Sequence, residues 1–222
     1  PIGRATADIA AGDHVHSHNL ATALQGLEDY AYAPQAPEPL AGSDASFLGY
    51  RRTDGRVGTR NEIWILCTVG CVARTAQRIA EAAAKRFAGR VDGVIALTHP
   101  FGCSQLGDDL SATRKMIAQL AGHPNAGGVL IVGLGCESNQ LGPLLETLEG
   151  VAPERLRAFS AQMSEDELEE GLACVEALVA VAEQDRREPC PVSDLVIGLK
   201  CGGSDGFSGL TANPLVGRIA DK

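Results

Sequence analysis

Four cysteines stand in turns of small residues, each directly after an apolar run that is typical of a buried strand. In an open parallel α/β sheet the carboxyl ends of the strands lie along one edge, and ligands bind in the crevice there. The four thiols are far apart in the sequence but could converge on that crevice. The alternative for each is a small apolar side chain in a tight turn. They are Cys71, Cys103, Cys136 and Cys201.

His99 ends the second expected strand, four residues before Cys103, so both side chains can face the crevice as base, proton donor or metal ligand. A hydrogen-bonded structural histidine is the alternative. The loop after Lys200 places three glycines around Ser204 and Asp205. Glycines let the backbone approach a ligand closely, while Ser204 and Asp205 would supply a donor and an acceptor. No Gly-x-Gly-x-x-Gly motif opens the first helix, so we expect no nucleotide cofactor.

His14, His16 and His18 alternate in a segment that has the period of a β-strand. Because alternate residues of a strand project from the same face, we expect the three imidazoles to lie together. Imidazole suits iron, zinc and manganese, which makes His14 and His16 candidate metal ligands. A solvated strand face is the alternative.

After Arg60, short apolar runs alternate with longer helical segments, which is typical of a parallel sheet with crossover helices. We therefore predict an α/β fold with a Rossmann-like open parallel sheet of about five strands and helices on both faces. The expected strands are residues 62–68, 93–98, 128–132, 157–161 and 195–199. The expected helices are residues 73–87, 110–121, 139–148 and 165–184, the last with Ser164 as N-cap and Glu167 three residues on.

The region before this domain has a different composition. Residues 1–24 indicate the end of a small β-rich module, because a turn precedes the alternating histidines. Residues 25–49 are proline-rich and lack periodicity, as in an extended linker. Residues 50–222 form the Rossmann-like domain and run into the start of a further domain. Since the chain begins without Met and stops soon after a glycine-rich loop, we expect it to be a fragment.

Composition excludes several classes of protein. The net charge is −9 and no run of Lys and Arg is present, so we expect no nucleic-acid partner. No apolar run approaches the roughly 20 residues of a membrane-spanning helix, and there is no signal peptide pattern, so we expect a cytoplasmic protein without a membrane partner. Seven scattered cysteines indicate reduced thiols. We assign a structural role to Cys67, Cys174 and Cys190.

Several of these motifs together resemble the altronate/galactarate dehydratase family, and the likeness covers nearly the whole chain. The matching segments are residues 58–61, 99–103, 133–137, 201–206 and 211–214. Residues 13–19 and 103–109 are similar to the version found in the altronate branch of that family. The resemblance implies a small amino-terminal domain of the SAF type, a Rossmann-like middle domain and a carboxy-terminal catalytic domain that this chain only begins.

The resemblance also implies an activity, which is the dehydration of a sugar acid to a 2-keto-3-deoxy acid with Fe²⁺ or Mn²⁺. His99 would then be the base, with Cys103 beside it, and Ser204 and Asp205 would orient substrate hydroxyls. Candidate metal ligands are Cys71, Cys103, Cys136, Cys201, His14 and His16. The alternatives are a non-catalytic scaffold fragment, or the elimination of sulfite from sulfolactate that some relatives perform. The expected partner is a small sugar acid, and we allow for a homo-oligomer.

Overall fold

The computed structural model describes residues 3–23, 39–40, 42–200, 202–203 and 207–221. The chain divides into two units. The larger unit is Asp44–Leu195, and the smaller unit combines Pro1–Ser43 with Val196–Lys222.

Four parallel strands form the central sheet of the larger unit, in the order β6-β5-β7-β8. The strands β5 and β7 are almost wholly buried, because both of their faces are covered and both consist largely of aliphatic residues. The predicted parallel α/β fold is therefore confirmed. The four strands are β5 (Glu62–Cys67), β6 (Gly93–Leu97), β7 (Ala126–Gly133) and β8 (Leu156–Ser160).

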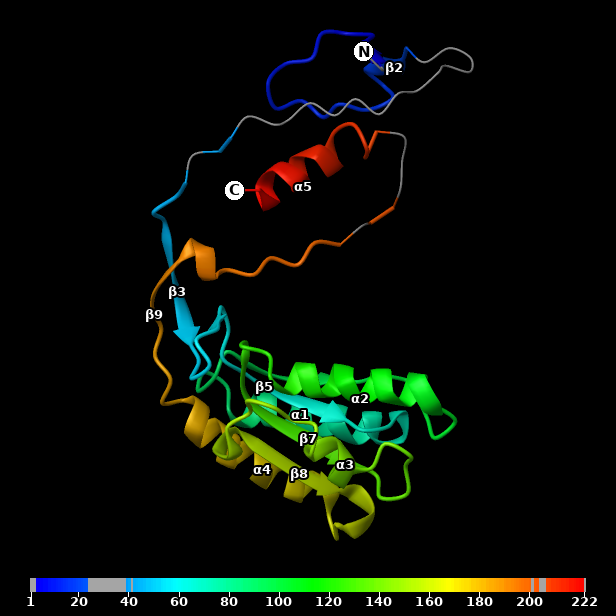
Figure 1. Cartoon of the computed structure of the whole chain (residues 1–222), viewed down its shortest axis with the longest axis vertical. Coiled ribbons are helices and arrows are strands. Elements are labelled where there is room, and N and C mark those ends of the chain that lie inside the picture. Colours follow the sequence, from blue (N-terminus) through cyan, green and yellow to red (C-terminus); the bar gives the residue numbers. More distant parts are fainter. Residues whose placement is uncertain (1–2, 24–38, 41, 201, 204–206, 222) are drawn as a thin grey trace. The chain divides into compact units, whose positions relative to one another are not determined.

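Helices cover both faces of this sheet, and Figure 1 shows α2 and α4 on opposite faces. Ile63 and Ile65 of β5 pack with helices α1 and α4, whereas Trp64 and Leu66 pack with α2 and α3, as expected from the alternation of side chains along a strand. The helices are α1 (Ala73–Arg86), α2 (Gly107–Ala121), α3 (Leu141–Leu145) and α4 (Glu167–Ala182). Short 3-10 helices are Gly70–Val72, Pro153–Arg155, Ala161–Met163 and Val192–Asp194.

The fifth expected strand is wrong. Residues 195–199 are all described and form no strand, and Val196 is 91% exposed. A short apolar run has strand-like composition, but it becomes a strand only where another strand can accept its backbone hydrogen bonds, and the sequence pattern does not show that partner.

A second, antiparallel sheet has the order β4-β3-β9. Its strands are β3 (Ser46–Arg51), β4 (Val57–Gly58) and β9 (Glu188–Pro191). Strand β3 begins within the range that we expected to be a linker. Its pairing with β9 joins residues about 140 positions apart, for example Phe47 opposite Cys190, which is fully buried.

Helix α4 begins differently from the expectation. Its N-cap is Asp166 and not Ser164, because the Asp166 carboxylate accepts hydrogen bonds from the backbone N–H groups of Leu168 at 2.9 Å and Glu169 at 3.1 Å. Ser164 Oγ is buried without a hydrogen-bond partner among the described residues. A carboxylate also interacts favourably with the positive end of the helix dipole, which explains why Asp166 caps the helix.

The smaller unit contains the antiparallel pair β1 (Gly3–Ala5) and β2 (Leu20–Thr22), and the helix α5 (Ala212–Ala220). The expected strand at His14–His18 is wrong, since none of these residues lies in a strand and Ser17 and His18 form a turn. Buried Asn19 holds that turn: its amide donates to His14 O at 2.9 Å, and its carbonyl accepts from His16 N at 2.9 Å. Within the described ranges, no helix is long and apolar enough to cross a membrane.

Candidate functional site

The strand order of the parallel sheet defines where a ligand crevice is expected. Strand β5 lies between β6 and β7, so the chain leaves β5 toward one side of the sheet and returns on the other side of β5. In such sheets the crevice forms at the carboxyl ends of the two strands where the order reverses. Here those strands are β5 and β7, and the loops that follow them begin at Thr68 and Leu134.

A buried carboxylate joins these two loops. Glu137 is 2% exposed, and its Oε1 accepts a hydrogen bond of 2.7 Å from Thr68 Oγ1. The same carboxylate accepts from the backbone N–H groups of Leu134, at 3.0 Å, and Gly135. The side chain therefore fixes the turn after β7 against the end of β5.

These contacts decide the charge of Glu137. Burial alone would raise the pKa of its carboxyl group, but the hydrogen bonds from Thr68 and from the backbone N–H groups of Gly135, Glu137 and Leu134 outweigh burial and hold the pKa below its usual value. A carboxylate with a lowered pKa and its acceptor sites in use is a poor general base. Glu137 is therefore a structural anion that shapes the crevice.

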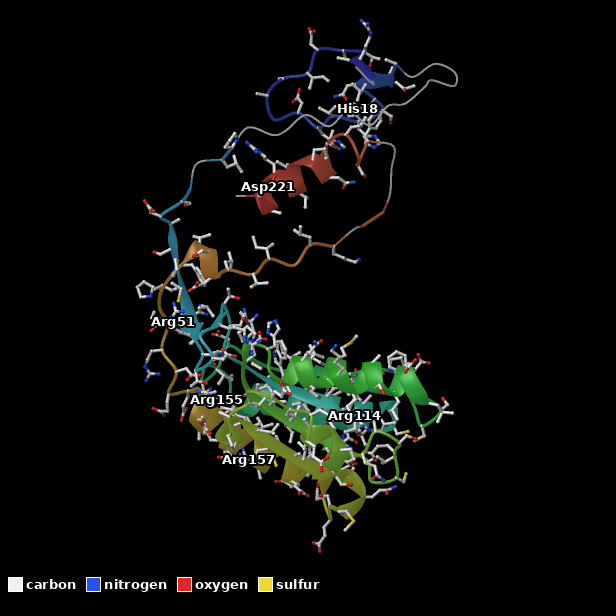
Figure 2. The ribbon with its side chains drawn as sticks, viewed as in Figure 1. His18, Arg51, Arg114, Arg155, Arg157 and Asp221 are labelled. Carbon is white, nitrogen blue, oxygen red and sulfur yellow. The ribbon has the colours of Figure 1, made fainter. Side chains whose placement is uncertain are left out.

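The network extends to helix α2 through Asn139. Its amide Nδ2 donates to Thr68 O at 3.2 Å, and its Oδ1 accepts from Arg114 Nε at 3.0 Å. Arg114 lies on α2 and is labelled in Figure 2. Three separate elements of the larger unit thus meet at the carboxyl edge through polar side chains.

Gly135 allows the turn after β7 to pass close to β8. Its φ of +128° lies in the region that favours glycine, and a Cβ at this position would come within 2.7 Å of Gln162 Oε1. The following residue, Cys136, is exposed, and its Sγ accepts a hydrogen bond of 3.5 Å from Gln162 Nε2.

His99 lies at the same edge, in the loop after β6. Its Nε2 is 3.1 Å from Cys67 O, and its Nδ1 accepts a hydrogen bond of 3.3 Å from the backbone N–H of Phe101. This pattern fits a neutral ring protonated at Nε2. Both ring nitrogens are thus engaged by backbone groups, as the structural alternative for His99 requires, and a catalytic role would need one of these bonds to open.

The three predicted cysteines of the larger unit lie in the loops of this edge, and all are exposed: Cys71, Cys103 and Cys136. Backbone contacts connect the loops. Gly70 N donates to Phe101 O at 2.7 Å, and Ser138 Oγ donates to Cys103 O at 3.2 Å. The fourth cysteine, Cys201, lies outside the described residues, as do Ser204 and Asp205.

The predicted histidines of the smaller unit come together through the turn at Asn19. The ring centroids of His14 and His16 are 5.5 Å apart, and those of His14 and His18 are 6.0 Å apart. The His16 ring also lies 5.8 Å from the ring of Phe207, which follows the glycine-rich loop. This unit therefore brings the histidine turn to the end of that loop.

Sequence reasoning missed Glu137, Thr68 and Asn139 as residues of the edge. Glutamate is usually a surface residue, so its burial could not be read from composition. The one available signal was its place directly after the Gly133–Cys136 turn, at the end of an apolar strand.

The strand order defines the larger unit as a parallel α/β domain. The polar network lies at the carboxyl ends of β5 and β7, where such domains bind ligands. Residues 49–183 match the family model described as D-galactarate dehydratase/altronate hydrolase, second domain. Residues 192–222 match the model described as D-galactarate/altronate dehydratase, C-terminal. The chain belongs to the galactarate/altronate dehydratase family.

Three relatives illustrate the similarity. Altronate dehydratase of Escherichia coli (strain K12) is 49% identical over 224 residues, which cover 100% of this chain and 45% of the relative. Altronate dehydratase of Bacillus subtilis (strain 168) is 46% identical over 228 residues, with the same coverage of 100% and 45%. Galactarate dehydratase (L-threo-forming) of Escherichia coli (strain K12) is 37% identical over 210 residues, or 88% of this chain and 40% of the relative. The chain thus spans less than half the length of these relatives.

Proposed function

We propose that the whole protein to which this chain belongs dehydrates an altronate-type hexonate to a 2-keto-3-deoxy acid. The observation that carries this proposal is the identity of 49% and 46% to two altronate dehydratases along the whole chain. The identity to galactarate dehydratase is lower, at 37%. This difference favours a hexonate, with one carboxylate, over a hexarate, with two.

The reaction removes a weakly acidic proton beside the carboxylate and expels the hydroxide from the next carbon. It therefore needs a base, a general acid for the leaving hydroxide, and positive charge near the developing enolate. A divalent metal bound by the protein would supply that charge by polarising the substrate oxygens.

In this proposal, His99 and Cys103 act at the carboxyl edge of the parallel sheet. For His99 to accept a proton at Nδ1, the substrate must replace the N–H of Phe101, which now occupies that nitrogen. Ser204 and Asp205 would orient substrate hydroxyls from the glycine-rich loop. Glu137 holds the edge in shape and takes no proton, because its acceptor sites are used by Thr68 and by backbone N–H groups.

The described residues do not by themselves complete a metal site, because none of them form a group of three or more His, Cys, Asp or Glu suited to hold a metal ion. The proposal of Fe²⁺ or Mn²⁺ thus requires further ligands. His14 and His16 are the candidates whose placement supports it best, since their rings already lie 5.5 Å apart. The cysteine candidates Cys71, Cys103, Cys136 and Cys201 stay part of the proposal.

An assay of the protein encoded by the complete open reading frame around this sequence tests the activity. The protein, supplied with Fe²⁺ or Mn²⁺, is incubated separately with altronate, galactarate and sulfolactate, and 2-keto acid and sulfite are measured. We expect 2-keto acid from altronate. Sulfite from sulfolactate would instead indicate a sulfo-lyase, and no reaction with any substrate would support a scaffold role and contradict the proposal.

Metal content separates the two sets of candidate ligands. We expect His14→Ala and His16→Ala to reduce the bound iron of the complete protein, with His123→Ala as the control, because His123 stacks on Trp64 in the larger unit. The bound iron of three further variants tests the cysteine ligands at the carboxyl edge of the sheet: Cys71→Ala, Cys103→Ala and Cys136→Ala. Unchanged iron in both histidine variants would remove His14 and His16 from the proposal.

A further inference from the structure

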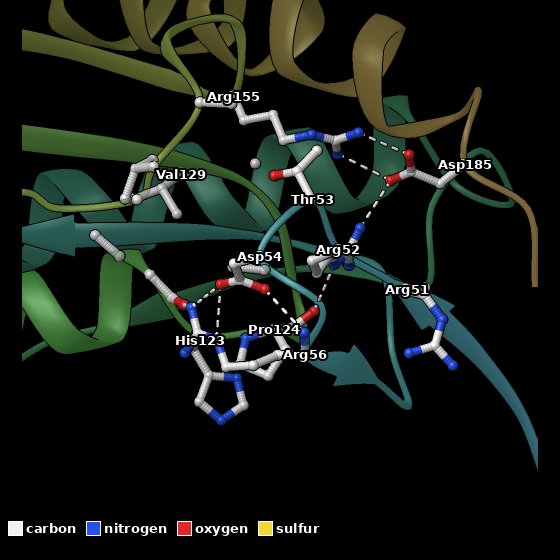
Figure 3. Close-up of a pocket in the computed structure, with 17 residues that line it drawn as sticks. Arg51, Arg52, Thr53, Asp54, Arg56, His123, Pro124, Val129, Arg155 and Asp185 are labelled. Carbon is white, nitrogen blue, oxygen red and sulfur yellow. Dashed lines mark hydrogen bonds and ion pairs between the residues drawn. The ribbon is translucent and has the colours of Figure 1, made fainter. Parts of the chain in front are cut away.

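A polar pocket lies at the amino-terminal edge of the parallel sheet, beside the segments that precede β7 and β8. It has a volume of about 90 Å³, and its wall includes Arg52, Thr53, Val129, Arg155 and Asp185. Figure 3 shows the guanidinium groups of Arg52 and Arg155 directed at the Asp185 carboxylate. Nothing in the proposed dehydration uses this pocket.

The two guanidinium groups share one carboxylate. Arg155 makes two bonds to Asp185, of 2.7 Å from Nη2 to Oδ1 and 2.9 Å from Nη1 to Oδ2. Arg52 Nη1 donates to the same Oδ2 at 2.9 Å. The side chains of Arg52, Arg155 and Asp185 are only 12%, 26% and 18% exposed. Two positive charges and one negative charge thus leave one net positive charge in a poorly solvated place.

The other arginines of the pocket carry no excess positive charge, and Arg51 faces two carboxylates. Arg51 forms ion pairs with Glu188 at 2.7 Å and Asp194 at 3.1 Å, and Arg56 forms an ion pair with Asp54 at 2.6 Å. The excess charge therefore belongs to Arg52 and Arg155, next to the hollow.

Backbone contacts hold these two guanidinium groups in place. Arg52 Nε donates to Pro124 O at 2.8 Å, and Arg155 Nη1 donates to Gly127 O at 2.7 Å. A fixed guanidinium loses little conformational entropy when it binds a ligand, so the site is preorganised.

Two pKa shifts agree with a positive environment that is short of solvent. Burial lowers the pKa of Arg52, which Asp185 only partly offsets, and the neighbouring charge of Arg155 lowers it further. Burial, followed by the positive charge of Arg56, lowers the pKa of His123, another residue of the wall.

We propose that this pocket binds a small oxyanion, either inorganic phosphate or the carboxylate group of a sugar acid. Asp185 already occupies the paired N–H groups of Arg155, so the excess positive charge of the two guanidinium groups is what would attract either anion. The hollow, at about 90 Å³, is large enough to receive such a group. The proposal does not depend on the proposed dehydratase activity.

Titration of the 222-residue chain tests the proposal directly. Sodium phosphate, altronate and sodium chloride are titrated separately at constant ionic strength, with heat and thermal unfolding as readouts. We expect saturable binding of one anion per chain and a rise in Tm with phosphate, altronate or both, but not with chloride. The arm that saturates identifies the source of the oxyanion, and no saturable binding in either arm would overturn the site.

Two variants of matched chemistry locate the binding. Arg155→Lys keeps the charge but loses the paired hydrogen bonds to Asp185 that fix this charge beside the hollow, so we expect affinity to fall about tenfold or more. Arg157→Lys is the control, since Arg157 lies in β8 and, among the described residues, its side chain donates only to the nearby backbone carbonyls of Pro153, Glu154 and Leu156. Both arginines are labelled in Figure 2. Equal affinity in the two variants would contradict the proposal.

A measurement on the unaltered chain covers the case in which Arg155→Lys does not fold. In amide NMR spectra, the saturating anion should shift the signals of Thr53, Val129 and Gly150, which line the pocket. Saturable shifts confined to other parts of the chain would overturn the assignment.

Discussion

Thr68 and Glu137 follow neighbouring strands of the parallel sheet, and their side chains share a hydrogen bond of 2.7 Å inside the protein. This bond joins the carboxyl ends of β5 and β7, which are the strands at which the order of the sheet reverses. The loops of the candidate site are therefore held by a buried anion and not only by backbone geometry.

Glu137→Gln tests the strength of this anchor. The amide offers one acceptor oxygen to donors that now share two, and its own N–H groups would face other N–H groups. We expect a loss of about 2–3 kcal/mol in the free energy of unfolding, measured with urea. The control is Glu146→Gln, because Glu146 is exposed at the end of α3. Equal stability of the two variants would show that the network contributes little.

The acid dependence of stability follows from the lowered pKa of Glu137. A carboxyl group whose pKa is lower in the folded state stabilises the fold above its unfolded pKa, and this contribution is lost as the pH falls through the folded pKa. We expect the Tm of the parent to drop as the pH falls below the ordinary value of 4.5. Glu137→Gln should show a weaker dependence, and parallel Tm curves for the two proteins would contradict this role of Glu137.

Asp185→Asn should destabilise the larger unit, because it leaves the guanidinium groups of Arg52 and Arg155 close together without their shared carboxylate. Both are mostly buried, so we expect a loss of about 2–3 kcal/mol in urea unfolding. The control is Asp194→Asn, whose partner Arg51 is 38% exposed. Exposed pairs contribute less than about 1 kcal/mol, so a similar loss in both variants would refute the argument from burial.

Gly171→Ala separates helix propensity from packing. Alanine is the better helix former by about 1 kcal/mol, but a Cβ here would overlap the fully buried Ile79 of α1. We expect a net destabilisation of about 1–3 kcal/mol, because the Ile79 side chain is fully buried and can move aside only by disturbing its packing. Gly142→Ala in α3 is the control, since a Cβ there meets nothing within 4 Å. A stabilised Gly171→Ala variant would mean that α1 and α4 separate more easily than their packing indicates.

The sequence predicted the four strands of the parallel sheet, because buried strands such as β5 and β7 are continuous aliphatic runs. It did not predict the sheet of β3 and β9, whose pairing of Phe47 with Cys190 depends on residues far apart in the chain. The same limit explains the error at 195–199, where strand-like composition lacks a partner among the described residues.

For the candidate site, the topology of the sheet predicted which loops share an edge, so the position of His99, Cys103 and Cys136 at that edge followed from the sequence, and their functional roles stay predictions. The hydrogen bonds of His99 to Cys67 and Phe101 were not predictable, because they depend on how the loop after β6 folds back. The alternation of histidines predicted a strand, but hydrogen bonds between the Asn19 side chain and the backbone of His14 and His16 fold this segment into a turn. The spacing of residues in the sequence does not reveal such contacts.

The most direct test of the proposed function is the reaction of the complete protein with altronate in D₂O, followed by NMR of the product. Elimination of the hydroxide gives an enol, and the enol takes a solvent proton at the carbon that lost the hydroxide as the keto group forms. We expect a 2-keto-3-deoxy acid that carries one deuterium at carbon 3. Altronate recovered unchanged, with Fe²⁺ or Mn²⁺ supplied, would contradict it.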